Sequence, residues 1–224
     1  MIMKNQHTPI AVEGIPFILI ALAITIVVTL VVYRFFPTSV AIIVAVPLVL
    51  LTIFVTMFFR NPDRVIPPDP KEVVSPADGT VLDIVRVTED ELLGGDAVRV
   101  SVFMSVWNVH VNRVPMSGRA ERVVYYPGKF LVARLDKAST DNERNALVIT
   151  NEEGVKILVV QIAGIVARRI VCYASEGDML EKGRRFGLIR FGSRLDVYFP
   201  TDAVIRVTEG DTVKAGETVL GELP

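Results

Sequence analysis

Two long uncharged apolar stretches near the N-terminus restrict the fold more than any other feature of the sequence. Residues 15–33 and 40–59 contain no charged side chain. At a rise of about 1.5 Å per residue, a helix of either length crosses a hydrocarbon core of about 30 Å. The connection at 34–39 is long enough only for a tight turn. We therefore predict an N-terminal α-helical membrane hairpin within residues 1–64, with both ends on the same side of the membrane.

Other interpretations of these two stretches fit the sequence less well. A cleaved signal peptide is shorter and is not followed at once by a second apolar stretch. Two helices buried in a soluble fold would need far more surrounding protein, so a hairpin embedded only partway is the main competitor. Three basic residues flank the hairpin ends, namely Lys4, Arg60 and Arg64. Only Arg34 lies in the turn, which predicts a cell (inner) membrane location with the remaining domain on the cytoplasmic side.

The rest of the chain has the composition of an ordinary soluble domain. Hydrophobic residues make up 51% of the chain and the mean hydropathy is +0.46, but residues 60–224 hold 22 of the 24 basic and 24 of the 25 acidic residues. A net charge of −1 without a basic block gives no support for nucleic-acid binding. Cys172 is the only cysteine, and it is expected to be a small buried hydrophobe. With His110 as the only histidine beyond the N-terminal tail, neither a disulfide nor a metal site is predicted.

Residues 65–224 are expected to form a mainly β domain. Short valine-rich runs bounded by Gly, Pro, Asn or Asp predict strands. These runs are 97–103, 119–125, 146–149, 156–160 and 165–173. Residues 132–138 and 89–93 have room for a turn or two of helix, and no longer amphipathic helix is indicated, so the expected class is a small sandwich or barrel. Three prolines within 65–70 predict a stiff linker in front of the domain.

An internal repeat supports this class of fold. Residues 176–183 (EGDMLEKG) match 209–216 (EGDTVKAG), and each copy contains a Gly-Asp turn, an apolar residue and a second glycine turn. Glycine supplies the positive φ that such turns need. Together with 75–81 (SPADGTV), the two copies are similar to the strands and turns of the biotinyl and lipoyl carriers. This resemblance implies a barrel-sandwich-hybrid-like domain and carries no information about function.

The pair Gly192-Ser193 interrupts an apolar stretch, 187–199, that otherwise predicts two strands. A glycine inside a strand usually marks a bulge, and the dipeptide alone would be interpreted in that way. The stretch 186–194 with Asp196, however, resembles the processing site of the short-form (prokaryotic), pyruvoyl-dependent phosphatidylserine decarboxylase proenzymes. Further motifs similar to that family occur in the same order. They are 58–62 (FFRNP), 74–79 (VSPADG), 103–105 (FMS), 109–113 (VHVNR), 127–130 (PGKF), 136–138 (DKA), 142–145 (NERN), 161–164 (QIAG) and 167–169 (ARR).

The resemblance implies that the chain decarboxylates phosphatidylserine to phosphatidylethanolamine and CO2, a step of phospholipid biosynthesis. Loss of CO2 leaves a carbanion, and no unmodified side chain offers the carbonyl that would delocalise its charge. Pyridoxal phosphate would serve, but the sequence shows no Gly-rich phosphate loop. The resemblance implies instead a pyruvoyl group, which forms a Schiff base with the substrate. It is made autocatalytically when the Ser193 hydroxyl attacks the Gly192 carbonyl. The products, a β chain of 1–192 and an α chain of 193–224, would remain a heterodimer, and a higher oligomer is compatible with the sequence.

The resemblance also assigns roles to His110 and Asp78. His110 would be the base for Ser193, since imidazole titrates near neutral pH, and Asp78 would complete a serine-protease-like triad. Without the resemblance, both would be interpreted as structural residues. The longer branch of the family has a second histidine as processing base, where this chain has Arg113, which is no base near neutral pH. Either His110 serves both steps, or processing relies on Asp78 and water while His110 protonates the α-carbon.

Four arginines near the processing site are candidates to bind the substrate phosphodiester, although a solvated basic face would explain them equally well. They are Arg184, Arg185, Arg190 and Arg194. The rival class is a membrane-anchored lipoyl-like adaptor without enzymatic activity, which predicts a coiled-coil insertion that the sequence lacks. A biotin or lipoate carrier would need a modified lysine at an exposed hairpin tip, and the repeat turns have no such motif. Neither rival explains residues 191–194.

Overall fold

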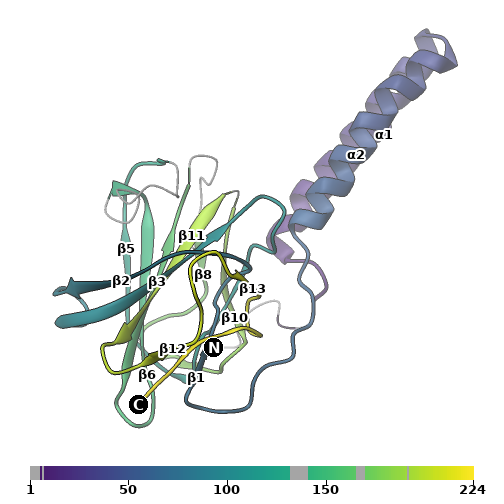
Figure 1. Ribbon diagram of the computed structural model, residues 1–224. Helices are drawn as coiled ribbons and strands as arrows, with labels where there is room; N and C mark the ends of the chain where they lie inside the picture. The colour runs from purple at the N-terminus through teal and green to yellow at the C-terminus, as the bar shows by residue number, and fades with distance from the viewer. Residues whose placement is uncertain (1–5, 7, 132–140, 165–169, 191) are drawn as a thin grey trace. The chain divides into compact units, whose positions relative to one another are not determined.

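The computed structural model describes Gln6 and residues 8–131, 141–164, 170–190 and 192–224. The chain divides into two compact units. One comprises residues 7–63, and the other comprises residues 64–224 with the segment at 1–6. The expected class, a mainly β chain with an apolar helical pair at its N-terminus, is confirmed (Figure 1).

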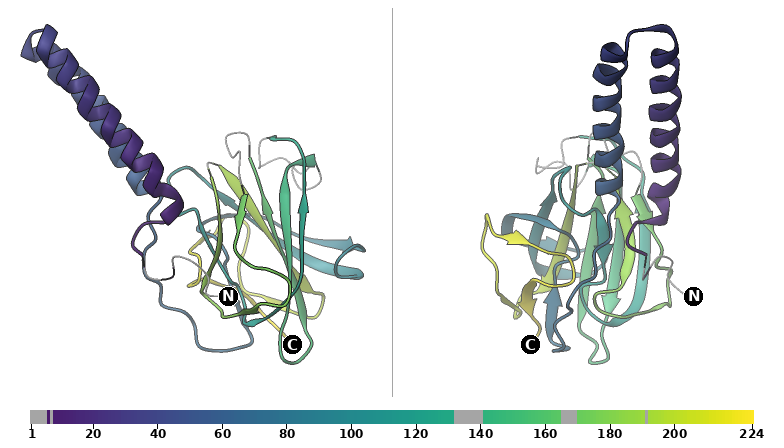
Figure 2. Two further views of the ribbon diagram at one scale, coloured as in Figure 1. Left: turned by 180° about the vertical axis from the view of Figure 1, so that it is seen from behind. Right: turned by 90° about the vertical axis from the view of Figure 1, so that its right-hand side faces the viewer.

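The helical unit is a hairpin of two long helices. A 3-10 turn at Val12–Gly14 (η1) leads into α1, Ile15–Phe35, and α2 spans Thr38–Phe58. Figure 2 shows the two helices side by side. Both are long and apolar enough to cross a membrane, and only 6% of the apolar window of each is buried. Core helices of a soluble fold are apolar and covered on most faces, and these two helices lack such cover among the described residues.

Threonine hydroxyls link the two helices near the middle of their length. Thr25 Oγ1 lies 2.9 Å from Thr52 Oγ1, and both hydroxyls lie within hydrogen-bond distance of the Leu48 carbonyl. In hydrocarbon such groups need partners within the protein, and these hydroxyls have them. The contact fixes the register of the two helices at a level where the surrounding side chains offer only dispersion forces.

The open end of the hairpin is closed by backbone hydrogen bonds. Ala11 N donates to Phe59 O at 2.8 Å, and Asn61 N donates to Pro9 O at 2.7 Å. Phe59 is buried against Gly14, where an added Cβ would lie 2.2 Å from the Phe59 ring. The entering and leaving segments are therefore held together, as the predicted short turn at the other end requires.

The β unit contains three antiparallel sheets within the described residues. The large sheet has eight strands in the order β13-β2-β3-β11-β7-β6-β5-β9, and two three-stranded sheets have the orders β4-β10-β8 and β1-β14-β12. Figure 1 shows that the large sheet is strongly curled. The strands are β1 Glu72–Val74, β2 Gly79–Glu89, β3 Gly95–Met104, β4 Val111–Arg113, β5 Gly118–Tyr126, β6 Arg144–Thr150, β7 Lys156–Ile162, β8 Ile170–Cys172, β9 Met179–Leu180, β10 Arg185–Ile189, β11 Ser193–Pro200, β12 Val204–Ile205, β13 Thr212–Val213 and β14 Val219–Glu222.

Strand β11 lies in the middle of the large sheet and is covered on both faces. Leu195, Val197 and Phe199 face the main core, because alternate side chains of a strand share one face. The opposite face of β6 and β7 carries a smaller cluster that includes Leu158 and Val160. This double coverage explains why β11 reads as a nearly continuous buried run rather than as an alternating one.

The two copies of the internal repeat adopt the same conformation. In each copy the first glycine has a φ of +90°, and the second has a φ of +81° or +77°. These glycines are Gly177, Gly183, Gly210 and Gly216. The first copy forms β9 and the second forms β13, which are the two edge strands of the large sheet. The repeat seen in the sequence therefore closes the sheet at both of its edges.

Some local expectations change. Glu89 ends β2 and residues 90–93 form the turn to β3 rather than a helix, and the Glu89 carboxylate accepts hydrogen bonds from the N–H groups of Leu92 and Leu93. The expected helical turn at 132–138 and the motifs at 136–138 and 167–169 lie outside the described residues, as does Phe191. Of the strand expected at 165–173, residues 170–173 are described, and β8 covers all of them but the last.

The proline-containing segment 65–70, predicted as a stiff linker in front of the domain, is part of the β unit. Ile66 packs so closely on Gly183 and Gly216 that an added Cβ would lie 2.3 Å and 3.1 Å, respectively, from the Ile66 Cδ1 atom. Val65 N also donates to Glu217 Oε1 at 3.3 Å. The second glycine of each repeat copy is therefore needed twice, for its positive φ and for the room that it leaves to Ile66.

Candidate active site

Two chain connections run between the same pair of sheets. β3 pairs with β11 in the large sheet, and β4 pairs with β10 in a small sheet. The connection from β3 to β4 carries His110, and the connection from β10 to β11 carries Gly192. Ser193, the first residue of β11, lies opposite Met104, the last residue of β3. This topology brings the predicted base and the predicted cleavage site to the same end of the large sheet.

The Gly192-Ser193 dipeptide has two unusual properties. The Ser193 side chain is fully buried, and its Oγ has no hydrogen-bond partner among the described residues. Leaving a buried hydroxyl unpaired costs about 1–3 kcal/mol, so such a group calls for an explanation. Gly192 has a φ of +62°, where an added Cβ would meet no atom within 4 Å. Glycine is therefore required by the backbone conformation, which costs an L-residue about 1–2 kcal/mol, and not by lack of space.

His110, the residue before β4 in the sequence, is fully buried, and its ring is oriented by the preceding turn. The Nδ1 atom lies 3.0 Å from the carbonyl oxygen of Asn108. A carbonyl only accepts hydrogen bonds, so we assign the proton to Nδ1, and the neutral ring then has its lone pair on Nε2. This is the tautomer that a general base needs.

Asp78 is held by a cation that the sequence analysis did not connect with it. Arg64 Nη2 lies 2.9 Å from both oxygens of the Asp78 carboxylate, and the two side chains are only 7% and 13% exposed. Glu217 lies 3.5 Å from the same guanidinium. The sequence offered Arg64 only as a basic residue beside the hairpin, because nothing in the spacing of residues 64 and 78 reveals their contact.

The internal repeat explains a second contact of Asp78. Its Oδ1 accepts a hydrogen bond from Ala215 N at 2.8 Å, in the second glycine turn of one copy. In the other copy the equivalent N–H, that of Lys182, donates to Ser117 Oγ at 3.0 Å. Asp78 and Ser117 both precede the glycine that begins a strand, β2 or β5. The interpretation of Asp78 as a turn residue thus has direct structural support.

The backbone nevertheless carries Asp78 towards His110. Val74 N donates to Pro115 O, and Arg113 N donates to Pro76 O, both at 2.9 Å. From the first of these hydrogen bonds to the second, the chain advances from Val74 to Pro76 on one segment and goes back from Pro115 to Arg113 on the other. Continued by one more step, this antiparallel register leads to Asp78 and Val111, which follows His110. Pro76, two residues before Asp78, thus lies beside Arg113, three residues after His110, while the described hydrogen bonds of the Asp78 carboxylate go to Arg64 and Ala215.

A layer of buried amides lies at the same end of the core. Gln161 Nε2 donates to Asn112 Oδ1 at 2.8 Å, and Asn145 Nδ2 donates to Gln161 Oε1 at 3.3 Å. Asn112 Nδ2 in turn points at the sulfur of Met104, the residue opposite Ser193. The apolar face of the sheet thus ends in a polar layer that includes Ser193. Sequence analysis missed this layer, although polar residues at core-facing positions of a strand are a recognisable signal.

Arg194 and Asp196 form a fully buried ion pair on the other face of β11. Arg194 Nε lies 2.6 Å from Asp196 Oδ1, and Nη2 lies 2.9 Å from Oδ2, with both side chains 0% exposed. Burial works to lower the pKa of Arg194, but the hydrogen bonds and charge of Asp196 raise it above its usual value. Burial, reinforced by Asp196, also raises the pKa of the neighbouring Tyr198 to about 12.

The four arginines expected to bind a phosphodiester differ in their surroundings. Arg194 is paired with Asp196 and shielded from solvent, which removes it from that role. Arg184 lies 2.9 Å from exposed Glu181, whereas Arg185 is fully buried and Arg190 is half-buried. The basic residues near Gly192-Ser193 therefore do not form one solvated face.

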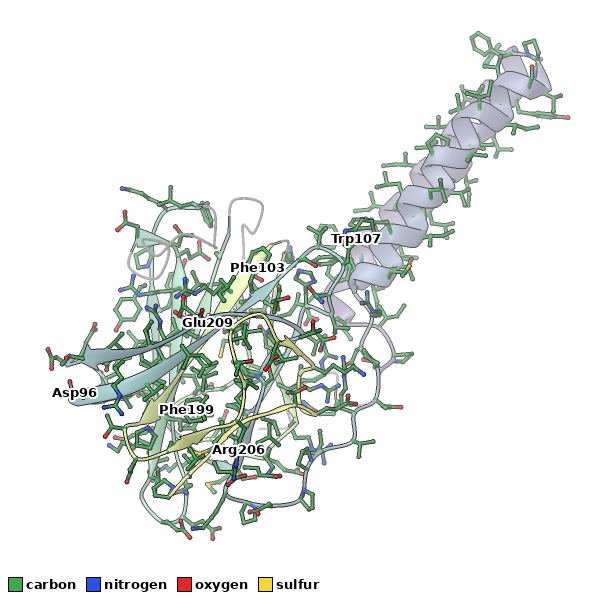
Figure 3. The ribbon with its side chains drawn as sticks, in the orientation of Figure 1. Asp96, Phe103, Trp107, Phe199, Arg206 and Glu209 are labelled. Carbon is green, nitrogen blue, oxygen red and sulfur yellow. The ribbon has the colours of Figure 1, made fainter. Side chains whose placement is uncertain are left out.

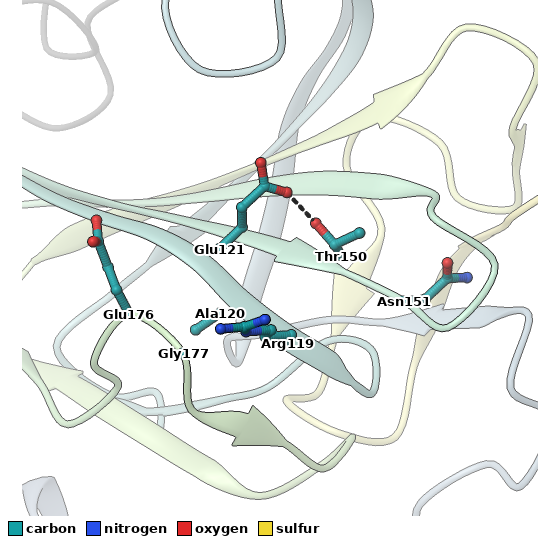
Figure 4. Close-up of a pocket in the computed structure, with 7 residues that line it drawn as sticks. All are labelled: Arg119, Ala120, Glu121, Thr150, Asn151, Glu176 and Gly177. Atoms are coloured by element: carbon teal, nitrogen blue, oxygen red, sulfur yellow. Dashed lines mark hydrogen bonds between the residues drawn. The ribbon is translucent and has the colours of Figure 1, made fainter.

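A hollow of about 630 Å³ opens at the other end of the large sheet (Figure 4). It is lined by Arg119, Ala120, Glu121, Thr150, Asn151, Glu176 and Gly177. Thr150 lies opposite Lys156 of β7, and Arg194 lies opposite Ile162 of the same strand. Lys156 and Ile162 are six residues apart along β7, a distance of about 20 Å. The hollow is therefore separate from the Gly192-Ser193 site.

Comparison with known proteins agrees with the motifs around this site. The family model for phosphatidylserine decarboxylase matches residues 51–221. The chain belongs to the phosphatidylserine decarboxylase family. The phosphatidylserine decarboxylase proenzyme of Geotalea uraniireducens (strain Rf4) is 50% identical over 222 residues, which cover 99% of the chain and 100% of that protein. The proenzymes of Geobacter metallireducens and Cupriavidus metallidurans are each 48% identical, with 99% of the chain covered and 100% and 98% of those proteins. The expected family is thus confirmed.

Cys172 is the only thiol of this phosphatidylserine decarboxylase family member, and it lies on β8 beside the amide layer. Burial raises the pKa of the Cys172 thiol, which keeps it protonated and weakly nucleophilic at neutral pH. We expect Cys172→Ser to retain at least about half of the decarboxylase activity and to be processed normally. A steady-state assay beside a thermal melt tests this, since a large loss of activity in a folded variant would give the thiol a chemical role.

Two substitutions at Asp78 separate its possible roles in this family member. Asp78→Ser copies the pseudo-equivalent Ser117, so it keeps a hydroxyl that can accept from the Ala215 N–H, while Asp78→Ala removes the cap. If Asp78 acts on His110, both variants should slow processing by about 10²-fold or more. If it acts only as a turn cap, Asp78→Ser should be processed normally. We expect slow processing of both variants, because the register leads Asp78 towards His110. Gel electrophoresis of samples taken over time measures how fast each chain is split.

Proposed function

We propose that the chain is a proenzyme that cuts its own backbone between Gly192 and Ser193 and converts Ser193 into a pyruvoyl group. The mature protein then decarboxylates phosphatidylserine to phosphatidylethanolamine and CO2. The observation that carries the proposal is the buried Ser193 hydroxyl without a partner among the described residues, next to Gly192 in the left-handed region. Membership of the family and the word proenzyme in the names of its relatives support it.

Processing needs only the dipeptide, a base and water. Ser193 Oγ loses its proton to the base and attacks the Gly192 carbonyl carbon, and the amide N–C bond breaks as an ester forms. Removal of the Ser193 α-proton then expels the Gly192 carboxylate and leaves dehydroalanine. Addition of water releases ammonia and leaves the ketone on residue 193. The products are a β chain of 1–192 and an α chain of 193–224, which stay together as a heterodimer.

His110 is the candidate base for the first proton transfer. Its Nδ1 contact with Asn108 O leaves the Nε2 lone pair for this role, and its connection runs beside the one that contains Gly192. Asp78 would act through its negative charge, which the ion pair with Arg64 partly neutralises. Arg113, at the position of a second histidine, donates from Nη1 to Gly183 O at 2.8 Å, which fits a structural role.

The surroundings of Ser193 fit a pyruvoyl group. That group supplies a ketone that takes up the electron pair released when CO2 leaves. The chain itself holds residue 193 in place, because β11 pairs with β3 on one side and with β7 on the other. The buried position keeps bulk water away, the amide layer provides polar neighbours, and we assign the return of the proton to His110.

The apolar hairpin suits a lipid substrate. Phosphatidylserine stays in the bilayer, so an enzyme anchored by two spanning helices meets it without extracting it into water. The excess of basic residues at the hairpin ends supports a site on the cytoplasmic side of the cell membrane.

Intact-mass measurement of the purified full-length protein tests the proposal. Two chains split before residue 193 are expected, and the small chain should be blocked at its N-terminus. Reduction with cyanoborohydride in the presence of phosphatidylserine should fix the lipid on the small chain, and CO2 release should accompany phosphatidylethanolamine formation. A single uncut chain that is fully active would refute the mechanism, and an uncut chain without activity would favour the non-enzymatic adaptor.

A further inference from the structure

The connection between β3 and β4 exposes an apolar tip close to the candidate active site. Residues 105–108 form a turn, called here the Trp107 turn, in which Asn108 N donates to Ser105 O at 3.0 Å. The Asn108 side-chain oxygen accepts hydrogen bonds from Ser105 N and Ser105 Oγ, at 2.9 Å and 2.7 Å. These bonds direct Val106 and Trp107 outwards, while His110, two residues further on, is fully buried.

Trp107 is unusually exposed for the only tryptophan of the chain. Its exposed fraction is 71%, and that of the adjacent Val106 is 37%. Figure 3 shows Trp107 beyond Phe103 at one end of β3, with Asp96 at the other end. Single exposed apolar residues are common, but an adjacent Val-Trp pair on a hydrogen-bonded turn is a small apolar tip on a rigid base.

Other exposed apolar side chains project from the same end of the sheet. Tyr125 lies opposite Asn145 at that end of β5, and Phe130 lies four residues after the last residue of β5. They are 55% and 38% exposed. The strand register connects this end of β5 to Ser193. Tyr126 at the end of β5 lies opposite Arg144 of β6, which in turn lies opposite Ile162 of β7. Ile162 lies opposite Arg194 of β11, the residue after Ser193. The apolar tips and the cleavage site therefore share one rim of the large sheet.

We propose that the Trp107 turn inserts into the interfacial region of a phospholipid bilayer and brings the active-site rim to the lipid headgroups. Indole suits this depth, since its ring is apolar while its N–H still finds polar partners, and tryptophan is enriched at membrane interfaces. The same chain has two helices long enough to cross a membrane. The inference rests on the proposed function, because a substrate that stays in the bilayer requires the site to reach the headgroup layer.

The single tryptophan makes a direct test possible. The full-length protein is reconstituted in bilayers of phosphatidylglycerol and phosphatidylcholine that carry bromine on the upper acyl carbons, and in matched bilayers without bromine. We expect Trp107 emission to be quenched to about half or less in the brominated bilayers. Equal emission in both bilayers would overturn the proposal. So would emission that changes with protein concentration and not with bromination, which would indicate contact with a second copy.

A matched control moves the tryptophan to the far end of the sheet. Met179 on β9 is 69% exposed and lies opposite Arg119, near the start of β5. In the double variant Trp107→Phe, Met179→Trp, the emission should not respond to brominated lipid. Equal quenching of this variant would mean that bromine reaches exposed tryptophans in general, and the specific contact would be refuted.

Kinetics give a second readout of the Trp107 turn. Trp107→Ala should raise the apparent KM for phosphatidylserine in vesicles by about 5- to 10-fold and change kcat by less than about 2-fold, and Trp107→Phe should restore most of the difference. An unchanged KM would count against the proposal. Quenching is also expected in the Ser193→Ala chain, so docking and the proposed chemistry can fail independently.

Discussion

Replacement of Ser193 by alanine is expected to leave the chain uncut and to remove its decarboxylase activity. The alanine lacks the oxygen that attacks Gly192, and without the cut no ketone forms at residue 193. Because enzymes accelerate their reactions by 10⁶-fold or more, the residual rate should be at least about 10⁴-fold below that of the parent protein. Intact mass and CO2 release from phosphatidylserine measure the two losses separately.

The same substitution should leave the fold intact. The Ser193 hydroxyl is buried without a hydrogen-bond partner among the described residues, so its removal exposes no partner and relieves a desolvation cost. We expect the midpoint of thermal unfolding to stay the same or to rise. Ser193→Cys is the matched control, because its thiol can still attack Gly192, and slow splitting should persist. Full activity of an uncut Ser193→Ala chain would disprove the assigned chemistry.

The second large effect is expected on stability, at the buried ion pair of β11. Asp196→Asn would leave the Arg194 guanidinium charged and fully buried without its carboxylate. Breaking a buried pair in this way costs about 3–5 kcal/mol. For a unit of this size that loss lowers the unfolding midpoint by about 6–20 °C.

A double replacement shows whether the charge or the shape of this pair matters. Arg194→Met with Asp196→Leu removes both charges and keeps most of the buried volume, so the desolvation cost disappears together with the attraction. The double variant should therefore unfold within a few degrees of the parent chain. If it is as unstable as Asp196→Asn, the attraction within the ion pair exceeds the desolvation cost of its two charges, and our account of β11 is wrong. Thermal melts of the three proteins in one detergent provide the comparison.

Local patterns predicted much of the fold. The charge-free stretches at 15–33 and 40–59 correspond to helices at Ile15–Phe35 and Thr38–Phe58, because a long apolar run is a strong helix signal, and only the end of α1 passes the charge that limited the first stretch. Valine-rich runs marked most strands for a similar reason. Residues 89–93 were misjudged as a possible helix, since Glu and Leu favour helices, but a hairpin between β2 and β3 overrides that weak preference.

The candidate site was only partly visible in the sequence. The motif around Gly192-Ser193 and the family resemblance pointed to the cleavage site, but sheet membership decides which connections run together. That information is non-local, as is the contact between Arg64 and Asp78. The Arg194–Asp196 pair, in contrast, could have been found. Positions i and i+2 of a strand share one face, so two opposite charges in an otherwise apolar strand predict a buried pair.

The place of β11 in the large sheet has a consequence for the lifetime of the finished protein. The segment after the proposed cut supplies this central strand, the edge strand β13, and two of the three strands of another sheet. Pulling the small fragment out would mean dismantling the whole β unit. A molecule whose ketone is lost to a side reaction therefore cannot be repaired by exchange with a fresh fragment, and restoring its activity requires synthesis of a new chain.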